Sequence, residues 1–415
     1  MNYIEYFKQE IVPAFGCTEP IALAYAAAKA KEVLGTNPDR IIARLSGSMI
    51  KNANSIKVPG TDGRKGIAIS LVTGAFLGDA EKKLRVLENV DKSRLCEADA
   101  LIEQGIVHTE LVPGVSNLYI EVEEHSGDDY AKVVLEDSHT NITLIERNEE
   151  ILYKQDKNSS KENTINFSFE QIYDFARNTD YSEIRPILDM EIEYNIAIAE
   201  EGIQNNWGSN IGKLVLDKRP DDFVEKMVAY ASAGADARMS GCEKPVVINS
   251  GSGNQGITVS VPIILYAREH HCEENQLYRA LIFANLLGLY MKQGIGKLSA
   301  YCGVVSASSA SVAGIAFLSG EGEKIIRELL TNSLVVNSGL ICDGAKPSCA
   351  MKIASSLRNA FLAYQQAKAG KSFQPGDGIV KDDFEETIHT ISVIARDGMK
   401  KTDEVILHEM VTETC

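Results

Sequence analysis

The spacing of hydrophobic and polar positions changes along the chain, from helical to β-rich and then back to helical. Residues 18–34 read TEPIALAYAAAKAKEVL, a nearly continuous apolar run with few polar side chains. Thr18 suits the N-cap position, Pro20 the first turn and Gly35 the position just after a helix. We therefore predict a single helix between these signals.

A β-rich pattern follows between residues 39 and 153. Short apolar runs, separated by glycine, proline and aspartate, lie at residues 41–49, 66–76, 117–125 and 131–147. Runs of this length between turn residues predict strands. Two stretches between them, 79–90 and 93–105, have a helical pattern. The segment as a whole therefore predicts an α/β unit.

Helical patterns dominate after residue 168, most clearly at residues 223–239, 274–292 and 350–370. Together these patterns predict an α+β protein, in which a mainly helical catalytic bundle carries a smaller inserted α/β domain. We expect the domains to be 1–38 with 165–415 (helical) and 39–153 (α/β), joined by a linker at 154–164. The linker reads KQDKNSSKENT and has almost no apolar side chains. The helix at 18–34 is expected to pack with the C-terminal bundle, so that Cys17 reaches the other cysteines.

The composition and net charge of the chain argue against some classes of binding partner. The chain has 415 residues, of which 44% are hydrophobic, and a formal net charge of −16, which argues against nucleic acid or an anionic membrane surface. Its most apolar stretch, 302–318, is interrupted by serines and falls short of the ~20 residues that span a membrane. No signal peptide is recognisable, so we expect a cytoplasmic protein. In that reducing compartment the eight cysteines are expected to be thiols or metal ligands.

Three cysteines, Cys302, Cys342 and Cys349, form a C-x39-C-x6-C arrangement. Three thiolates can hold a [4Fe–4S] cluster and leave one iron free to bind substrate as a Lewis acid. The spacing alone also allows a zinc ion with a fourth ligand, or cysteines that are only small buried side chains.

The position of these cysteines relative to predicted helices favours a chemical role. Cys302 and Cys349 lie where helices are expected to begin, and Cys17 lies just before an expected N-cap. Helix N-termini stabilise thiolates, so Cys17 is a candidate catalytic base. Cys415 ends the chain and is either a fourth cluster ligand or part of a frayed terminus.

Two polar loops are candidates for substrate binding. The loop SGSGNQGI at 250–257 precedes an apolar helical run, and its free N–H groups can hold a carboxylate. A close helix crossing explains its glycines equally well. The loop LSGSMIKNANSIKVPGTDG at 45–63 follows a predicted strand. The candidate substrate contacts in the two loops are Ser250, Asn254, Gln255, Ser46, Ser48, Lys51 and Asn52.

The motifs GCTEPIALAYAAA, SGSMIKNANSIKVPGT and SGSGNQGI, with the three-cysteine set, resemble the iron–sulfur L-cysteine desulfidases. These enzymes are related to the iron–sulfur L-serine dehydratases, and the resemblance covers nearly the whole chain. It implies that Cys302, Cys342 and Cys349 hold a [4Fe–4S] cluster and that Cys17 is the base. It also implies conversion of L-cysteine to pyruvate, ammonia and hydrogen sulfide without pyridoxal phosphate. Some of the dehydratases place a C-terminal cysteine on the open iron, as Cys415 would.

Three functions follow from the sequence. The first is L-cysteine desulfidase and the second is L-serine dehydratase on the same scaffold. The third is a non-catalytic amino-acid-binding module with a structural metal. For each we expect a small amino acid as ligand, and we expect the protein to be a homodimer.

Overall fold

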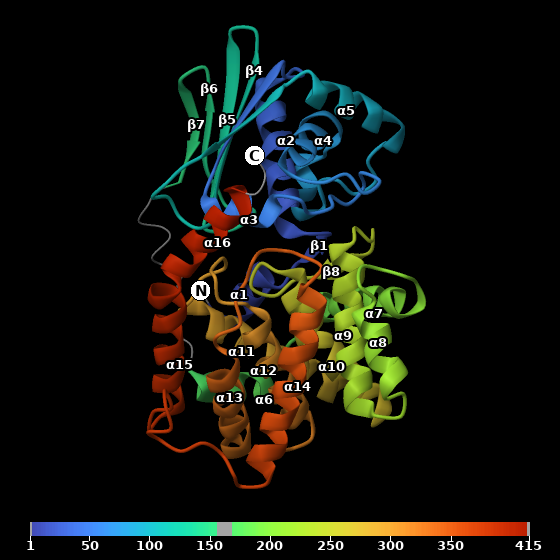
Figure 1. The fold of residues 1–415 in the computed structure, drawn as a ribbon, viewed down its shortest axis with the longest axis vertical. Helices are drawn as coiled ribbons and strands as arrows, with labels where there is room; N and C mark the ends of the chain where they lie inside the picture. The colour runs from blue at the N-terminus through green and yellow to red at the C-terminus, as the bar shows by residue number, and fades with distance from the viewer. Residues whose placement is uncertain (1, 156–167, 413–415) are drawn as a thin grey trace.

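The computed structural model describes residues 2–155 and 168–412. It has two layers: a six-stranded sheet with a few helices lies above a bundle of helices (Figure 1). The predicted α+β class is confirmed. Among the described residues, no helix is both long enough and apolar enough to cross a lipid bilayer.

The large sheet has the strand order β3-β2-β4-β5-β6-β7. Strands β2 and β3 are parallel, and all other neighbouring pairs are antiparallel. Side chains on β4 alternate between buried and half-buried, as expected for a sheet with one face on the core. The strands are β2 (Arg40–Leu45), β3 (Val107–Leu111), β4 (Tyr119–Ser126), β5 (Asp129–Glu136), β6 (Ile142–Arg147) and β7 (Glu150–Lys154).

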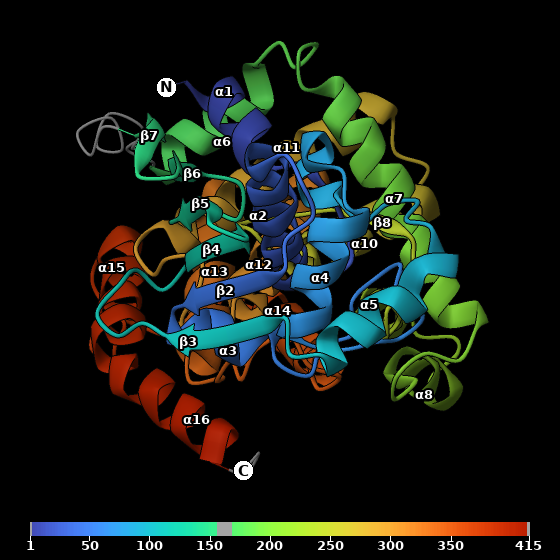
Figure 2. The same cartoon turned by 90° about the horizontal axis from the view of Figure 1, so that it is seen from above.

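Helix α2 (Thr18–Leu34) packs on this sheet, against β4 and β5, and beside α4 (Ile67–Leu77) (Figure 2). The expectation that the body of this helix packs with the C-terminal bundle was wrong. Its side chains are almost all small and apolar and are buried on nearly every side, so the helix fits between the sheet and α4. The helix begins one residue earlier than predicted, because Cys17 rather than Thr18 is the N-cap.

The segment 66–76 forms helix α4, although its β-branched residues predicted a strand. Packing explains the difference, because Gly74 lies directly on the backbone of α2. A Cβ atom at Gly74 would be 2.3 Å from the carbonyl oxygen of Ala24, so the small residue lets the two helices touch. The helix predicted at 79–90 is only a short 3-10 turn, Ala80–Arg85. The other elements here are α3 (Gly47–Ala53), the 3-10 turn Lys92–Arg94 and α5 (Leu95–Glu103).

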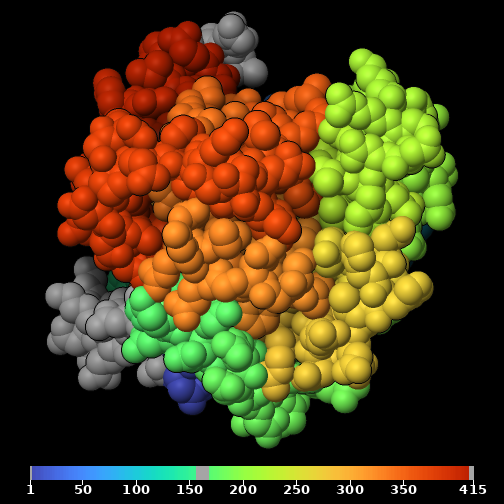
Figure 3. Space-filling model, turned by 90° about the horizontal axis from the view of Figure 1, so that it is seen from below, coloured from blue at the N-terminus to red at the C-terminus, as the bar shows by residue number. Residues whose placement is uncertain are grey.

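The lower layer is the helical bundle, which covers nearly the whole face seen in Figure 3. The helices predicted at 223–239, 274–292 and 350–370 are all present, within one or two residues of the expected ends. The helices are α6 (Phe169–Asn178), α7 (Arg185–Gln204), α8 (Ile211–Lys218), α9 (Phe223–Met239), α10 (Gly253–Glu269), α11 (Glu274–Gln293), α12 (Val304–Leu318), α13 (Glu323–Asn337), α14 (Cys349–Lys368), α15 (Phe384–Val393), the π-helical turn Ile394–Gly398 and α16 (Lys400–Thr412).

A short antiparallel ladder joins two segments that are far apart in the sequence. Strand β1 (Pro13–Phe15), which follows α1 (Tyr3–Glu10), pairs with β8 (Pro245–Val247). Because β1 leads into Cys17 and β8 leads into the loop at 250–257, the ladder places these two segments side by side. The hydroxyl of Thr18 then donates to the carbonyl oxygen of Gly251 at 2.9 Å.

The division into domains at residues 38, 153 and 165 remains a prediction. Most of the expected linker, and Cys415, lie outside the described residues. The role expected for Cys415 therefore also remains a prediction.

Candidate functional site

One cavity at the junction of the two layers is lined by four cysteines: Cys17, Cys302, Cys342 and Cys349. It contains about 630 Å³ of space not filled by protein atoms, the open mouth included. Cys17, Cys302 and the Cys342–Cys349 segment come from separate parts of the sequence, so the fold brings them together. The remaining described cysteines, Cys96, Cys242 and Cys272, do not line this cavity.

An isolated β-bridge places Cys302 beside Cys342. Tyr301 and Ile341 form the bridge, while the amide of Cys342 donates to Ala300 at 2.7 Å and that of Cys302 to Leu340 at 3.0 Å. The two thiols share a hydrogen bond, which raises the pKa of Cys302 and lowers the pKa of Cys342. The hydrogen bond thus stabilises the thiolate form of one member of the pair.

Cys349 is the first residue of α14, two residues beyond Pro347. Its thiol lies 3.7 Å from the carbonyl oxygen of Gly344, in the loop that follows Cys342. Burial raises the pKa of Cys349. The loop between Cys342 and Cys349 therefore bends so that both sulfurs reach the same cavity.

Positive charges surround the three sulfurs. Lys51 and Lys352 act to lower the pKa of Cys342, and Lys292 interacts electrostatically with Cys302 and Cys342. These cations would stabilise the negative charge of three thiolates and of the anionic metal centre that the thiolates would hold.

Three cysteines line this one cavity, and two of them, Cys302 and Cys342, lie close enough for their thiols to share a hydrogen bond. Within residues 2–155 and 168–412, no three His, Cys, Asp or Glu side chains lie close enough together to hold one metal ion. Three cysteines on one cavity can serve an iron–sulfur cluster or a zinc ion that has a fourth ligand.

Cys17 donates a hydrogen bond to Glu19, with 3.2 Å between Sγ and Oε2. Burial and the charge of Glu19 raise the pKa of Cys17 well above its usual range. Burial also acts to raise the pKa of Glu19, but the charge of His139 and the hydrogen bond from Cys17 hold it below its ordinary value. These shifts favour a proton on sulfur rather than on the carboxylate in this state.

Four charged residues that line the cavity were not identified from the sequence: Glu19, Arg238, Lys292 and Lys297. Glu19 accepts from Thr18 at 3.0 Å and from Asn52 at 3.0 Å, in addition to Cys17. Lys292 is buried, which lowers its pKa to about 8. Only Glu19, which lies in the GCTEP motif two residues after Cys17, had a sequence signal.

His139 lies behind the cavity wall, on the turn between β5 and β6. A Cβ atom at Gly251 would be 3.1 Å from the imidazole ring, so the ring packs against the loop at 250–257. Burial lowers the pKa of His139 to about 4, and its Nε2 atom has no hydrogen-bond partner among the described residues. The upper layer thus contributes to the site, which the sequence had not indicated.

The predicted substrate contacts divide into two groups. Asn52, Asn254 and Gln255 line the cavity. Ser250, Ser46, Ser48 and Lys51 are buried but are not part of the lining.

Local hydrogen bonds explain why three of these side chains point elsewhere. Ser46 caps α3 and donates to the carbonyl oxygen of Asn117 at 2.6 Å. Ser48 and Lys51 both donate to Asp403 on α16, and Lys51 also donates to the carbonyl oxygen of Cys342 at 3.2 Å. Ser46, Ser48 and Lys51 therefore connect the elements that surround the cavity and do not line it.

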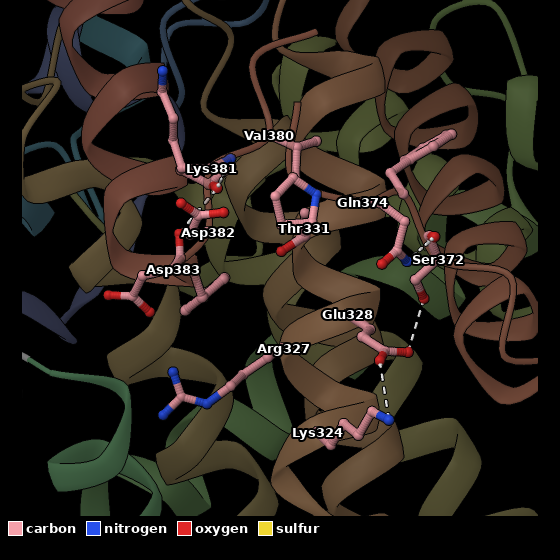
Figure 4. Close-up of a pocket in the computed structure, with 14 residues that line it drawn as sticks. Lys324, Arg327, Glu328, Thr331, Ser372, Gln374, Val380, Lys381, Asp382 and Asp383 are labelled. Carbon is pink, nitrogen blue, oxygen red and sulfur yellow. Dashed lines mark hydrogen bonds and ion pairs between the residues drawn. The ribbon is translucent and has the colours of Figure 1, made fainter. Parts of the chain in front are cut away.

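A second hollow lies between α13 and the segment that leads into α15 (Figure 4). Two of its charged groups are paired with neighbours: Glu328 accepts from Ser372 at 2.8 Å and lies 3.9 Å from Lys324. No cysteine or histidine lines it. The candidate chemistry is therefore in the cysteine cavity.

Residues 81–408 match the family model of the serine dehydratase alpha chain. The chain belongs to this family. Bacterial relatives of nearly the same length are named UPF0597 protein. That of Lachnoclostridium phytofermentans is 44% identical over 98% of this chain and 99% of its own length. Those of Finegoldia magna and Desulfitobacterium hafniense are 42% and 41% identical, over 99% of this chain in both cases and 99% and 97% of their own lengths.

Membership of the serine dehydratase alpha chain family confirms the broader part of the expected resemblance. It indicates a lyase-type enzyme associated with iron–sulfur chemistry. The names of the relatives specify no substrate.

Proposed function

We propose that this protein is a [4Fe–4S]-dependent L-cysteine desulfidase, which eliminates hydrogen sulfide from L-cysteine and yields pyruvate and ammonia. The observation that carries the proposal is the convergence of four cysteines on one cavity. Three of them, Cys302, Cys342 and Cys349, are the ligand set. The fourth, Cys17, lies next to a carboxylate, as a proton carrier would.

The cluster would supply a Lewis acid that draws electrons from the substrate, which acidifies its Cα–H bond and helps the leaving group to depart. All proton transfer then falls to the side chains of the chain. No lysine Schiff base is required for this reaction.

Cys17 and Glu19 provide the base. Cys17 must be a thiolate before it can take the Cα proton, and Glu19 is the carboxylate that already accepts its hydrogen bond. Arg238 and the N-terminus of α2 reduce the cost of that charge on sulfur. Elimination of sulfide leaves aminoacrylate, which tautomerises to an imine, and water hydrolyses the imine to pyruvate and ammonia.

L-Serine dehydratase is the second candidate, and the family model favours it by name. The same base removes the same proton, and only the leaving group differs. The motifs GCTEP and SGSMIKNANSIKVPGT favour the desulfidase, because they resemble that group of enzymes.

The test is product analysis with anaerobically purified, cluster-loaded protein. L-Cysteine should give sulfide, pyruvate and ammonia in equal amounts, with kcat/KM higher than that for L-serine. Cys242→Ala, which changes a buried cysteine away from the cavity, serves as the matched control and should keep this activity. Pyruvate from L-serine alone would establish the dehydratase. If cluster-loaded protein converts neither amino acid, the remaining candidate function is the non-catalytic amino-acid-binding module.

A further inference from the structure

Arg238 is a buried cation whose guanidinium faces the cysteine cavity. It lies in the last turn of α9 and is 3% exposed. Its Nε donates to the carbonyl oxygen of Gly16 at 3.1 Å, and its Nη1 donates to the side-chain oxygen of Asn254 at 3.1 Å. Its Nη2 is buried and has no hydrogen-bond partner among the described residues.

Neither hydrogen-bond partner is charged, because a peptide carbonyl and an amide are both neutral. The nearby carboxylate of Glu19 interacts with Arg238 electrostatically, but its hydrogen bonds come from Cys17, Thr18 and Asn52 and it leaves Nη2 without a partner. A buried cation with a free N–H group is costly unless an anion completes it.

The beginning of α10, a helix of 17 residues, lies next to the guanidinium. Its N-cap, Ser252, makes no side-chain capping bond, and Gly251, Ser252, Asn254 and Gln255 line the cavity. The first amides of a helix carry partial positive charge and favour anions. A Cβ atom at Gly253 would be 2.4 Å from Nε of Arg238, so the guanidinium packs directly on this helix end.

We propose that Arg238, with the first amides of α10, receives the α-carboxylate of the substrate. This assignment rests on the proposed function and extends it to a specificity-determining residue. A carboxylate there would complete the hydrogen bonds of the guanidinium fork. The remaining side of the cavity holds the cluster cysteines, so the carboxylate end and the leaving-group end of the substrate would be separated. The ligand class is therefore the small α-amino monocarboxylates, and their amides and esters are excluded.

The proposal is tested by equilibrium binding to the loaded protein under anaerobic conditions, using isothermal titration. L-Alanine is the probe, because it carries the carboxylate but no leaving group and cannot be eliminated. L-Alaninamide, which lacks the carboxylate, is its partner. Wild-type protein should bind L-alanine at least about 30-fold more tightly than L-alaninamide, as expected when a buried charge pair loses one member. Equal affinity for the two ligands would overturn the proposal without any variant.

Variants of Arg238 then test whether this residue binds the carboxylate. Arg238→Gln should weaken L-alanine about 30-fold or more, and Arg238→Lys by less, because lysine keeps the charge but not the fork. Both should leave the weak binding of L-alaninamide unchanged. Absorbance near 400 nm and Tm, measured on the same samples, show whether the variants keep their cluster and fold. Arg358→Gln is the control, because Arg358 pairs with Glu225 and does not line the cavity.

These results separate the two claims. If L-alanine binds through Arg238 while L-cysteine is not converted, the carboxylate site stands and the desulfidase fails. If L-cysteine is converted by Arg238→Gln with unchanged KM, the desulfidase stands and the carboxylate site is refuted.

Discussion

The thiol of Cys17 donates to the carboxylate of Glu19 across 3.2 Å at the edge of a cavity lined by three further cysteines. Both groups are buried and lie at the start of the same helix. The pair supplies a proton carrier and its acceptor, and it leaves Cys302, Cys342 and Cys349 free for a different task.

Replacing Cys17 by serine should abolish turnover but not the cluster. A hydroxyl is a far weaker acid than a thiol, so it cannot serve as the base, and kcat should fall by about 100- to 10,000-fold. The visible spectrum should stay unchanged, because this residue is not a ligand. Near-wild-type turnover would place the base elsewhere, and a lost spectrum would make Cys17 a ligand.

Replacing Glu19 by glutamine tests the second half of the pair. An amide cannot take the thiol proton, so kcat should fall by roughly 100-fold or more while iron content is unchanged. The measurement is steady-state kinetics together with iron analysis. Glu243→Gln is the control, since that carboxylate pairs with Lys92 on the surface and should not affect turnover. If Glu19→Gln and Glu243→Gln have the same kcat, Glu19 takes no part in the reaction.

The ion pair of Lys51 with Asp403 joins α3 to α16, next to the loop that carries Cys342. Lys51 is 2% exposed, so Asp403→Asn should leave a buried ammonium without its counter-charge. We expect the free energy of unfolding to fall by about 1–3 kcal/mol. Urea denaturation measures this. Asp397→Asn, which breaks an exposed pair with Arg396 nearby, should change it by less than about 0.5 kcal/mol. If Asp403→Asn and Asp397→Asn lower the free energy of unfolding equally, Lys51 does not need Asp403 as its counter-charge.

Glu124 on β4 is fully buried, and neither carboxylate oxygen has a hydrogen-bond partner among the described residues. Burial raises its pKa far above the ordinary value, and the charge of Lys31 only partly opposes this. The folded protein therefore holds this proton to higher pH than the unfolded chain, whose glutamates titrate near pH ~4.3. Stability is lost as pH rises above that value, by up to ~1.4 kcal/mol per pH unit until the folded-state pKa is reached.

Glu124→Gln removes this penalty, because an amide does not ionise. The variant should therefore gain more stability over wild type at pH 8 than at pH 5, as measured by urea denaturation at both values. A difference between variant and wild type that is the same at both pH values would show that Glu124 does not titrate in this range.

The sequence predicted the helices at 223–239, 274–292 and 350–370, because helical periodicity is a local signal. The three cysteines proposed as cluster ligands line one cavity, and their role as ligands remains a prediction. The sequence pattern failed at 66–76, where β-branched residues favour a strand but packing of Gly74 on α2 imposes a helix. It also failed to identify Arg238 and His139, since neither has a motif around it. The ladder between β1 and β8 and the turn between β5 and β6 bring these residues to the site, and such long-range pairings leave no local pattern.

Of the four candidate substrate contacts in the loop at 45–63, only Asn52 lines the cavity. Ser48 and Lys51 are polar and follow a strand, as substrate contacts often do, but they bind Asp403 on α16 instead. Their partner lies more than three hundred positions away in the sequence, so the sequence offered no means of separating support of the site from contact with its ligand.

The central claim is that Cys302, Cys342 and Cys349 hold a [4Fe–4S] cluster. It is tested most directly by counting iron and inorganic sulfide in anaerobically reconstituted protein, together with the absorbance near 400 nm. Wild type and the control Cys242→Ala should each contain about four irons and four sulfides per chain. Cys302→Ala, Cys342→Ala and Cys349→Ala should each contain little of either. Wild-type iron and sulfide in all three variants would contradict the account.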